Sequence, residues 1–186
     1  MPIKWSFNQA VELETMSRDV RSGVCMVMSY YVCKRILAGL ETTPDILRRK
    51  MPMFASMQRA GQGDVKLSGV GWVEMLARGD NLNVKVGEYK DTFEEAFALG
   101  SVGAELPDAV SCFVEFKWQH VGHAVVMGAK LKGKQKLWMF DPNVGLVKLK
   151  GDDDMQLILG KYPTPGKIGV VLLWGTPRDM KMLAAD

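Results

Sequence analysis

The C-terminal half of the sequence is a succession of extended segments separated by short turns. Four segments rich in β-branched and aromatic residues follow one another from Ala109 onward: AVSCFVEFKW, GHAVVMGAKL, KLWMFDP and GKIGVVLLW. Parallel neighbours need a long crossover, so strands joined by turns as short as QHVG and KGKQ pair antiparallel. The sequence therefore predicts an antiparallel sheet, with one further helix over Asp152 to Tyr162 before the last strand.

The N-terminal half shows helical patterns. The segment Ser22 to Leu37, SGVCMVMSYYVCKRIL, is apolar nearly all round, which is typical of a buried helix. Other helices are predicted over Pro44 to Ala60, Gly71 to Arg78 and Asp91 to Leu99. An interior proline loses a hydrogen bond and clashes with the preceding turn, so a break is expected at Pro52. Asp91 and Glu94 resemble a capping box.

These patterns predict an α+β fold, in which a helical N-terminal lobe with one buried helix packs on a C-terminal antiparallel sheet. The chain has 186 residues, 47% of them hydrophobic and 24% charged, and no repeat or linker divides it. We therefore expect a single globular domain over residues 1–186.

Charge and hydropathy exclude several classes of partner. The formal net charge is only +3, so no strong field favours nucleic acid or anionic lipid. No apolar run approaches the roughly 20 residues that a membrane span needs, and the first twenty residues lack the apolar core of a signal peptide. We expect synthesis in the cytoplasm and, for an exported protein, secretion into a target cell without a cleaved signal peptide.

Cysteine and histidine are scarce, with three and two residues respectively. An odd number of cysteines without repeated spacing does not predict a disulfide framework, so all three are interpreted as free thiols. The absence of a C-x-x-C pair argues against zinc, and no cofactor or metal is expected.

Cys25 is the candidate nucleophile. It lies two residues after Gly23, in the first turn of the predicted buried helix. The unpaired N–H groups and partial positive charge at a helix N-terminus favour a thiolate. Cys33 lies deep in the same helix and Cys112 in the middle of a strand, and both are interpreted as core residues.

His123 is the candidate base. It opens the strand HAVVMGAKL, in which His123, Val125, Met127 and Ala129 share one apolar face. That face is expected to turn toward the helices and Cys25. His120 lies in the preceding turn, at an odd offset from His123, and is the weaker candidate.

Asp141 is the candidate partner of the histidine. It ends the next strand in WMFDPNVG, where Pro142 terminates the ladder. One hairpin reverses the chain, so the end of this strand lies near the start of the strand that contains His123. A carboxylate there can fix the imidazole tautomer and stabilise the imidazolium.

The motifs S-G-V-C, G-H-A-V-V and F-D-P-N-x-G, in this order, resemble the papain-fold cysteine proteases, and specifically the YopT-like effector proteases. The resemblance implies a papain-like fold with Cys25 as nucleophile, His123 as general base and then acid, and Asp141 as the orienting group. It also implies a thioester intermediate and no cofactor.

The same resemblance implies an oxyanion hole made by the Cys25 backbone N–H and an upstream side-chain amide. Papain-like enzymes place glutamine six residues before the nucleophile, where this chain has Asp19. The nearest upstream amides are Asn8 and Gln9, which are the candidate donors.

The function predicted is that of a cysteine endopeptidase, a bacterial effector or toxin that acts on a target protein. The alternatives are a deamidase or acyl-transfer toxin on the same fold, a cell-wall amidase, and an inactive papain-fold binding module, for which Asp19 is the argument. The expected partners are a protein substrate and an immunity or chaperone protein.

Overall fold

The computed structural model describes residues 3–14, 24–64, 69–92, 95–96, 109–118, 122–131, 134–149, 160, 162 and 164–185. Within these ranges seven strands form one sheet, in the order β1-β6-β5-β4-β3-β7-β2, and neighbouring strands are antiparallel. Four of them are the extended segments predicted from the sequence: β3 (Ala109–Lys117), β4 (Gly122–Leu131), β5 (Lys134–Asp141) and β7 (Lys167–Trp174).

Three shorter strands were not predicted. They are β1 (Ile3–Ser6), β2 (Asn83–Val86) and β6 (Gly145–Lys148), each of four residues. Four residues give too little alternation to identify a strand from sequence. β1 pairs with β6 at one edge of the sheet, so the N-terminal segment lies beside the turn that follows Asp141.

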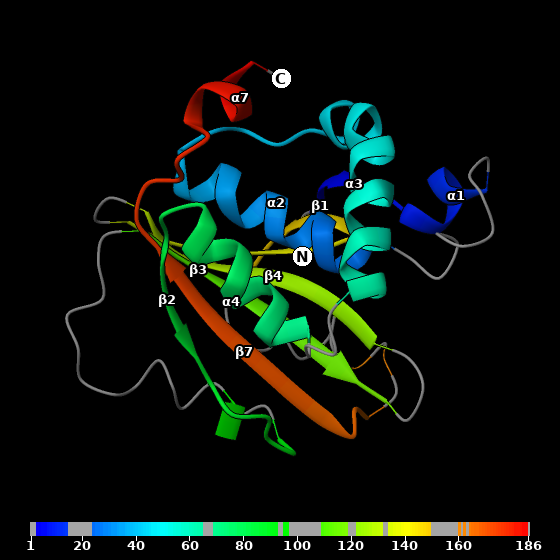
Figure 1. The fold of residues 1–186 in the computed structure, drawn as a ribbon, viewed down its shortest axis with the longest axis vertical. Coiled ribbons are helices and arrows are strands. Elements are labelled where there is room, and N and C mark those ends of the chain that lie inside the picture. Colours follow the sequence, from blue (N-terminus) through cyan, green and yellow to red (C-terminus); the bar gives the residue numbers. More distant parts are fainter. Residues whose placement is uncertain are drawn as a thin grey trace.

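The described helices are α1 (Gln9–Leu13), α2 (Cys25–Leu37), α3 (Pro44–Asp64), α4 (Gly69–Gly79) and α7 (Met180–Ala184). Figure 1 shows α2 and α4 lying across one face of the sheet, with α3 packed against α2. Residues around the whole circumference of α2 are buried, as its apolar sequence predicts. The predicted α+β arrangement, with a buried helix on an antiparallel sheet, is confirmed. None of the described helices is long and apolar enough to cross a membrane.

The break expected at Pro52 is absent, because α3 continues through this residue. Leu47 and Met51 before the proline and Phe54 after it are almost completely buried. Burial of one such side chain contributes about 1.5–3 kcal/mol, while an interior proline costs about 3 kcal/mol. Packing on both sides of Pro52 therefore offsets the lost hydrogen bond.

The helix predicted over 91–99 is described only in part, with residues 95 and 96 helical. Its cap is Thr92, whose Oγ1 accepts a hydrogen bond from the Glu95 backbone N–H at 3.2 Å. Asp91 pairs instead with Lys167 at 2.7 Å. Except for residues 160 and 162, the helix predicted over 152–162 lies outside the described residues.

The sheet separates two apolar cores. One lies between the sheet and the helices and includes Ala124 and Val126 of β4. The other lies on the opposite face and includes Val125 and Met127. The prediction that the face of Val125 and Met127 turns toward the helices is therefore wrong. Both faces of β4 are apolar and buried, so alternation alone could not identify the one that meets α2.

A single glycine on β4 makes room for a tryptophan ring of β5. A Cβ atom added to Gly128 would lie 1.7–2.0 Å from ring atoms of Trp138, its partner residue on β5. We expect Gly128→Ala to lower the free energy of unfolding by about 1–3 kcal/mol, because the indole must move out of its packing. Denaturant unfolding measures this change.

Gly79→Ala is the matched control, because nothing lies within 4 Å of the added methyl group. It should not lower the free energy of unfolding, and loss of a helical glycine should raise it by up to about 1 kcal/mol. A Gly128→Ala variant as stable as the wild type would contradict the packing argument.

Candidate active site

Cys25 is the first residue of α2, and its side chain is partly exposed, whereas Cys33 and Cys112 are buried. The residue before it, Val24, begins the helix through its carbonyl, which accepts the Met28 N–H at 3.0 Å. All three cysteines are free, as expected. Among them, Cys25 alone combines a position at a helix N-terminus with access to solvent.

The first turns of α2 are joined to the start of β4. Ser29 Oγ donates a hydrogen bond to the Ala124 carbonyl at 3.0 Å. Ser29 lies about one turn after Cys25, and Ala124 follows His123 directly. This bond therefore places the N-terminus of α2 beside the His123 end of the strand.

His123 meets Cys25 despite its place in the alternation of β4. Side chains alternate between the two faces of a strand, so the His123 side chain should lie on the same face as that of Val125, away from α2. However, β5 pairs with β4 only from Val126 onward, so His123 stands at an open end of the sheet. From there the imidazole lies close enough to the Cys25 side chain for the two groups to interact, and this interaction acts to raise the pKa of His123.

The other side of the imidazole is held by Asp141. The distance from His123 Nε2 to Asp141 Oδ1 is 3.0 Å, and the two residues are 7% and 1% exposed. With Nε2 engaged by the carboxylate, Nδ1 is the ring nitrogen available to the Cys25 thiol. The structure thus brings together the three residues that the sequence identified separately.

Asp141 uses both of its oxygens. Oδ1 also accepts the Asn143 backbone N–H at 2.8 Å, and Oδ2 accepts a hydrogen bond from the Tyr162 hydroxyl. A buried carboxylate is costly unless its oxygens are paired, and these donors supply that pairing.

Tyr162 is the site residue that the sequence analysis missed. Its hydroxyl oxygen lies 3.2 Å from His123 Nε2, and its ring lies against the imidazole, with centroids 5.1 Å apart. Burial, followed by the charge of Asp141, raises the pKa of Tyr162. The phenol therefore stays protonated and donates. Nothing local in the sequence marks Tyr162, since it meets Asp141 only through the fold.

The environment of His123 favours its protonated form. Burial acts to lower the pKa of His123, but hydrogen bonds and charges from Asp141 and Cys25 outweigh burial and raise it to about 9. By contrast, burial raises the pKa of Cys33 to about 12. It raises the pKa of Cys112 as well.

The two candidate oxyanion donors have different surroundings. Gln9 is buried, its Oε1 accepts the Val24 N–H at 2.9 Å, and its Nε2 donates to Asn143 Oδ1 at 3.0 Å. Asn8 is exposed, and its side chain caps α1 by accepting the Ala10 N–H at 3.0 Å. The structure places Gln9 next to the nucleophile helix and Asn8 on the surface. Asp19 lies outside the described residues.

The fold has solved counterparts. The Pseudomonas avirulence protein AvrPphB superposes with a TM-score of 0.51 at 12% identity, over 89% of this chain and 100% of that one. PatoxP, a cysteine protease-like domain of the Photorhabdus asymbiotica toxin PaTox, gives a TM-score of 0.48 at 12% identity, over 92% of this chain and 54% of that one. No protein-family model and no curated protein matches the sequence. The predicted papain-like α+β fold is confirmed.

The raised pKa of His123 makes stability depend on pH. The imidazole has a folded-state pKa of about 9 against an ordinary value of 6.5. Its contribution is therefore fully present below pH 6.5 and is lost as the pH rises through 9. We expect the free energy of unfolding to fall over this interval by up to about 3 kcal/mol. Denaturant unfolding at a series of pH values measures the loss.

His123→Gln serves as the control, because it removes the titrating group. The buried thiols Cys33 and Cys112 add a loss of their own only above about pH 8.5, where thiols ionise in the unfolded chain. The difference between the free energies of unfolding of the wild type and His123→Gln therefore gives the contribution of the imidazole. An equal loss between pH 6.5 and 8.5 in both would contradict the assignment.

Proposed function

We propose that this chain is a cysteine endopeptidase of the effector or toxin type, which cleaves a target protein with Cys25, His123 and Asp141. The observation that carries the proposal is the buried His123 imidazole, which lies 3.0 Å from Asp141 and within interaction range of the Cys25 side chain. A nucleophile, a base and a group that orients the base are the elements that thiol-dependent acyl transfer requires.

The reaction follows from this order of groups. His123 takes the thiol proton, and the Cys25 sulfur attacks the peptide carbonyl carbon to give a tetrahedral oxyanion. The protonated imidazole then gives its proton to the departing amine, which leaves a thioester on Cys25. Water, deprotonated by His123, attacks this thioester and releases the carboxylic acid and the thiol.

Asp141 and Tyr162 are assigned positioning roles. The carboxylate holds the imidazole through Nε2 and stabilises the imidazolium as it forms. The Tyr162 hydroxyl holds the second carboxylate oxygen, and its ring covers the imidazole. Excluding water from this pair strengthens the electrostatic interaction.

Gln9 is the oxyanion donor that fits this site. One of its two Nε2 protons is used by Asn143 Oδ1, which leaves the second for an oxygen beside Cys25. Its Oε1 is fixed by the Val24 N–H, one residue before the nucleophile. A donor held in place before the charge develops stabilises the transition state without reorganisation.

Proteolysis is tested by exposing a proteome to the protein and to its Cys25→Ala variant, and labelling the new N-termini for mass spectrometry. We expect new N-termini in the wild-type sample and none with Cys25→Ala, because the variant lacks the nucleophile. The variant should remain folded, with the circular dichroism spectrum of the wild type, since Cys25 is only partly buried.

Each other outcome identifies a different activity. Intact chains with Gln-to-Glu changes indicate a deamidase, and peptides released from peptidoglycan indicate a cell-wall amidase. If the wild type and Cys25→Ala capture the same partner equally well and neither cleaves it, the chain is a binding module. Cleavage by the Cys25→Ala variant would contradict the nucleophile.

The oxyanion donor is tested by comparing two neighbouring amides. Gln9→Ala should slow Cys25-dependent hydrolysis of p-nitrophenyl acetate by about 10²-fold, because one oxyanion donor is lost. Asn8→Ala should leave the rate within about twofold, since Asn8 only caps the five-residue α1.

Alkylation of Cys25 by iodoacetamide separates chemistry from structure, because that reaction forms no oxyanion. The alkylation rate of Gln9→Ala should stay within about threefold of the wild-type rate, with Cys33 and Cys112 unlabelled in both proteins. Equal loss of hydrolysis and alkylation would instead mean that Gln9 acts only by holding Val24 and Asn143.

A further inference from the structure

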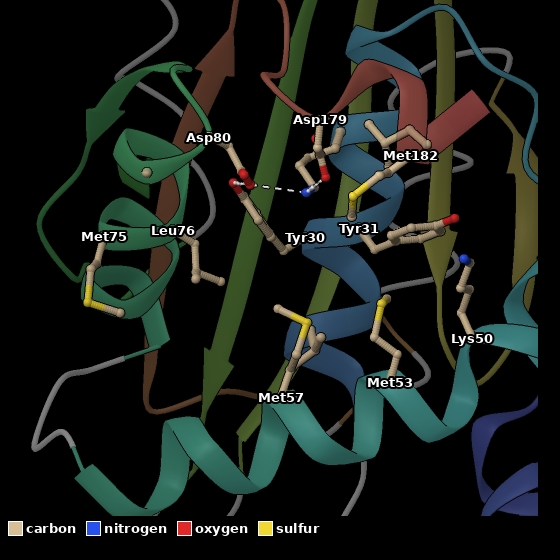
Figure 2. Close-up of a pocket in the computed structure, with 14 residues that line it drawn as sticks. Tyr30, Tyr31, Lys50, Met53, Met57, Met75, Leu76, Asp80, Asp179 and Met182 are labelled. Carbon is tan, nitrogen blue, oxygen red and sulfur yellow. Dashed lines mark hydrogen bonds and ion pairs between the residues drawn. The ribbon is translucent and has the colours of Figure 1, made fainter. Parts of the chain in front are cut away.

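A pocket lies between the helices, apart from the candidate active site. Residues of α2, α3, α4 and α7 enclose a volume of about 360 Å³, and Cys25, His123 and Asp141 are not among them (Figure 2). The lining is mostly apolar, with Val27, Leu76 and four methionines. A volume above about 300 Å³ is in the range of pockets that hold small ligands.

Exposed methionines gather at this pocket. Met53 of α3, Met75 of α4 and Met182 of α7 are 36%, 46% and 71% exposed, and all three line it. They are three of the five large hydrophobic side chains that are exposed in the described part of the chain. Methionine is flexible and polarisable, so such a lining adapts to an apolar guest.

One end of the pocket is acidic. Lys34 Nζ lies 3.1 Å from Asp80 and 2.7 Å from Asp179, so two carboxylates share one ammonium group. Figure 2 shows Asp80 and Asp179 at the top of the pocket. The carboxylate side chains are 25% and 22% exposed, while that of Lys34 is 11% exposed. This end therefore presents a net negative charge to the pocket.

Two further observations favour a cationic guest at this end. Tyr30 OH donates to Asp80 Oδ2 at 2.6 Å, but Asp179 Oδ1 is buried with no hydrogen-bond partner among the described residues. Lys34 already balances the charge of this carboxylate through Oδ2, but Oδ1 lacks a hydrogen-bond donor, which the N–H groups of an ammonium would supply. The other cation of the lining, Lys50, already has an interaction partner.

From these features we propose that the pocket binds a small amphiphile, an unbranched apolar chain that carries one protonated amine. The chain lies among Met53, Met57 and Met75, and the ammonium lies beside Asp80 and Asp179. An anionic head would be repelled by the same carboxylates. This inference is independent of the proposed protease activity, because it uses no residue of the triad.

The test is a titration with octylammonium, 1-octanol and octanoate, followed through the ¹³C-methyl signals of methionine. We expect octylammonium to bind about tenfold more tightly than octanoate, with shifts at Met53, Met57, Met75 and Met182. Met127 and Met139 lie in the other core and should not shift. Asp179→Asn should weaken octylammonium binding about tenfold and leave octanol binding unchanged.

Glu88→Gln is the matched control, because it removes one acidic charge at an 87% exposed side chain outside the pocket. It should leave all three affinities unchanged. If Asp179→Asn does not fold, Met53→Trp provides the second test, since the indole fills the mouth of the pocket and should abolish binding of all three compounds. Octanoate binding as tightly as octylammonium, shifts that extend to Met127 and Met139, or no binding would overturn the proposal.

Discussion

The burial of α2 between the sheet and α3 is the constraint on which the rest of the structure depends. A helix that is apolar on all sides can be covered only by packing elements on all sides, and here the sheet and α3 make the main contacts. The Ser29 hydrogen bond to the Ala124 carbonyl fixes its position along β4. A shift of one residue would rotate the helix by about 100°, so the direction of the Cys25 thiol follows from this packing.

Hydrogen bonds between buried polar groups join three separate parts of the chain at the candidate site. The Gln9 backbone N–H donates to the Pro142 carbonyl at 2.8 Å, while its side chain links Val24 to Asn143. The N-terminal segment thus touches both the nucleophile helix and the turn after Asp141. Because each buried partner would be costly if left unpaired, the amide, the carboxylate and the phenol hold one another in place.

Local sequence signals predicted the elements but not all of the contacts between them. The four long strands were identified from their long runs of β-branched and aromatic residues. The strands β1, β2 and β6 have four residues each, too few to show such a pattern. Cys25 was identified from its place at the start of a helix, and Asp141 from its place at the end of a strand. The face assigned to His123 was wrong, because both faces of β4 are buried.

The remaining contacts depend on residues that are distant in sequence. Tyr162 is 21 residues from Asp141, and Gln9 is 134 residues from Asn143. No period or motif links such pairs, so only the assembled sheet reveals them. The same holds for the pocket, whose methionines come from three helices and appear in the sequence as isolated apolar residues.

The Cys25 thiol and the acidic end of the pocket lie at opposite ends of α2, although the pocket lining extends along the helix to Val27. Lys34 is nine positions after Cys25, about 13 Å along the axis at 1.5 Å per residue. Between them the helix is buried and bonded to β4, and a second packing arrangement would have to break these contacts. A guest in the pocket therefore adds its binding free energy to the stability of the fold, according to its concentration relative to Kd. Coupling to the thiol would require a second arrangement of α2, and the all-round burial of this helix disfavours one.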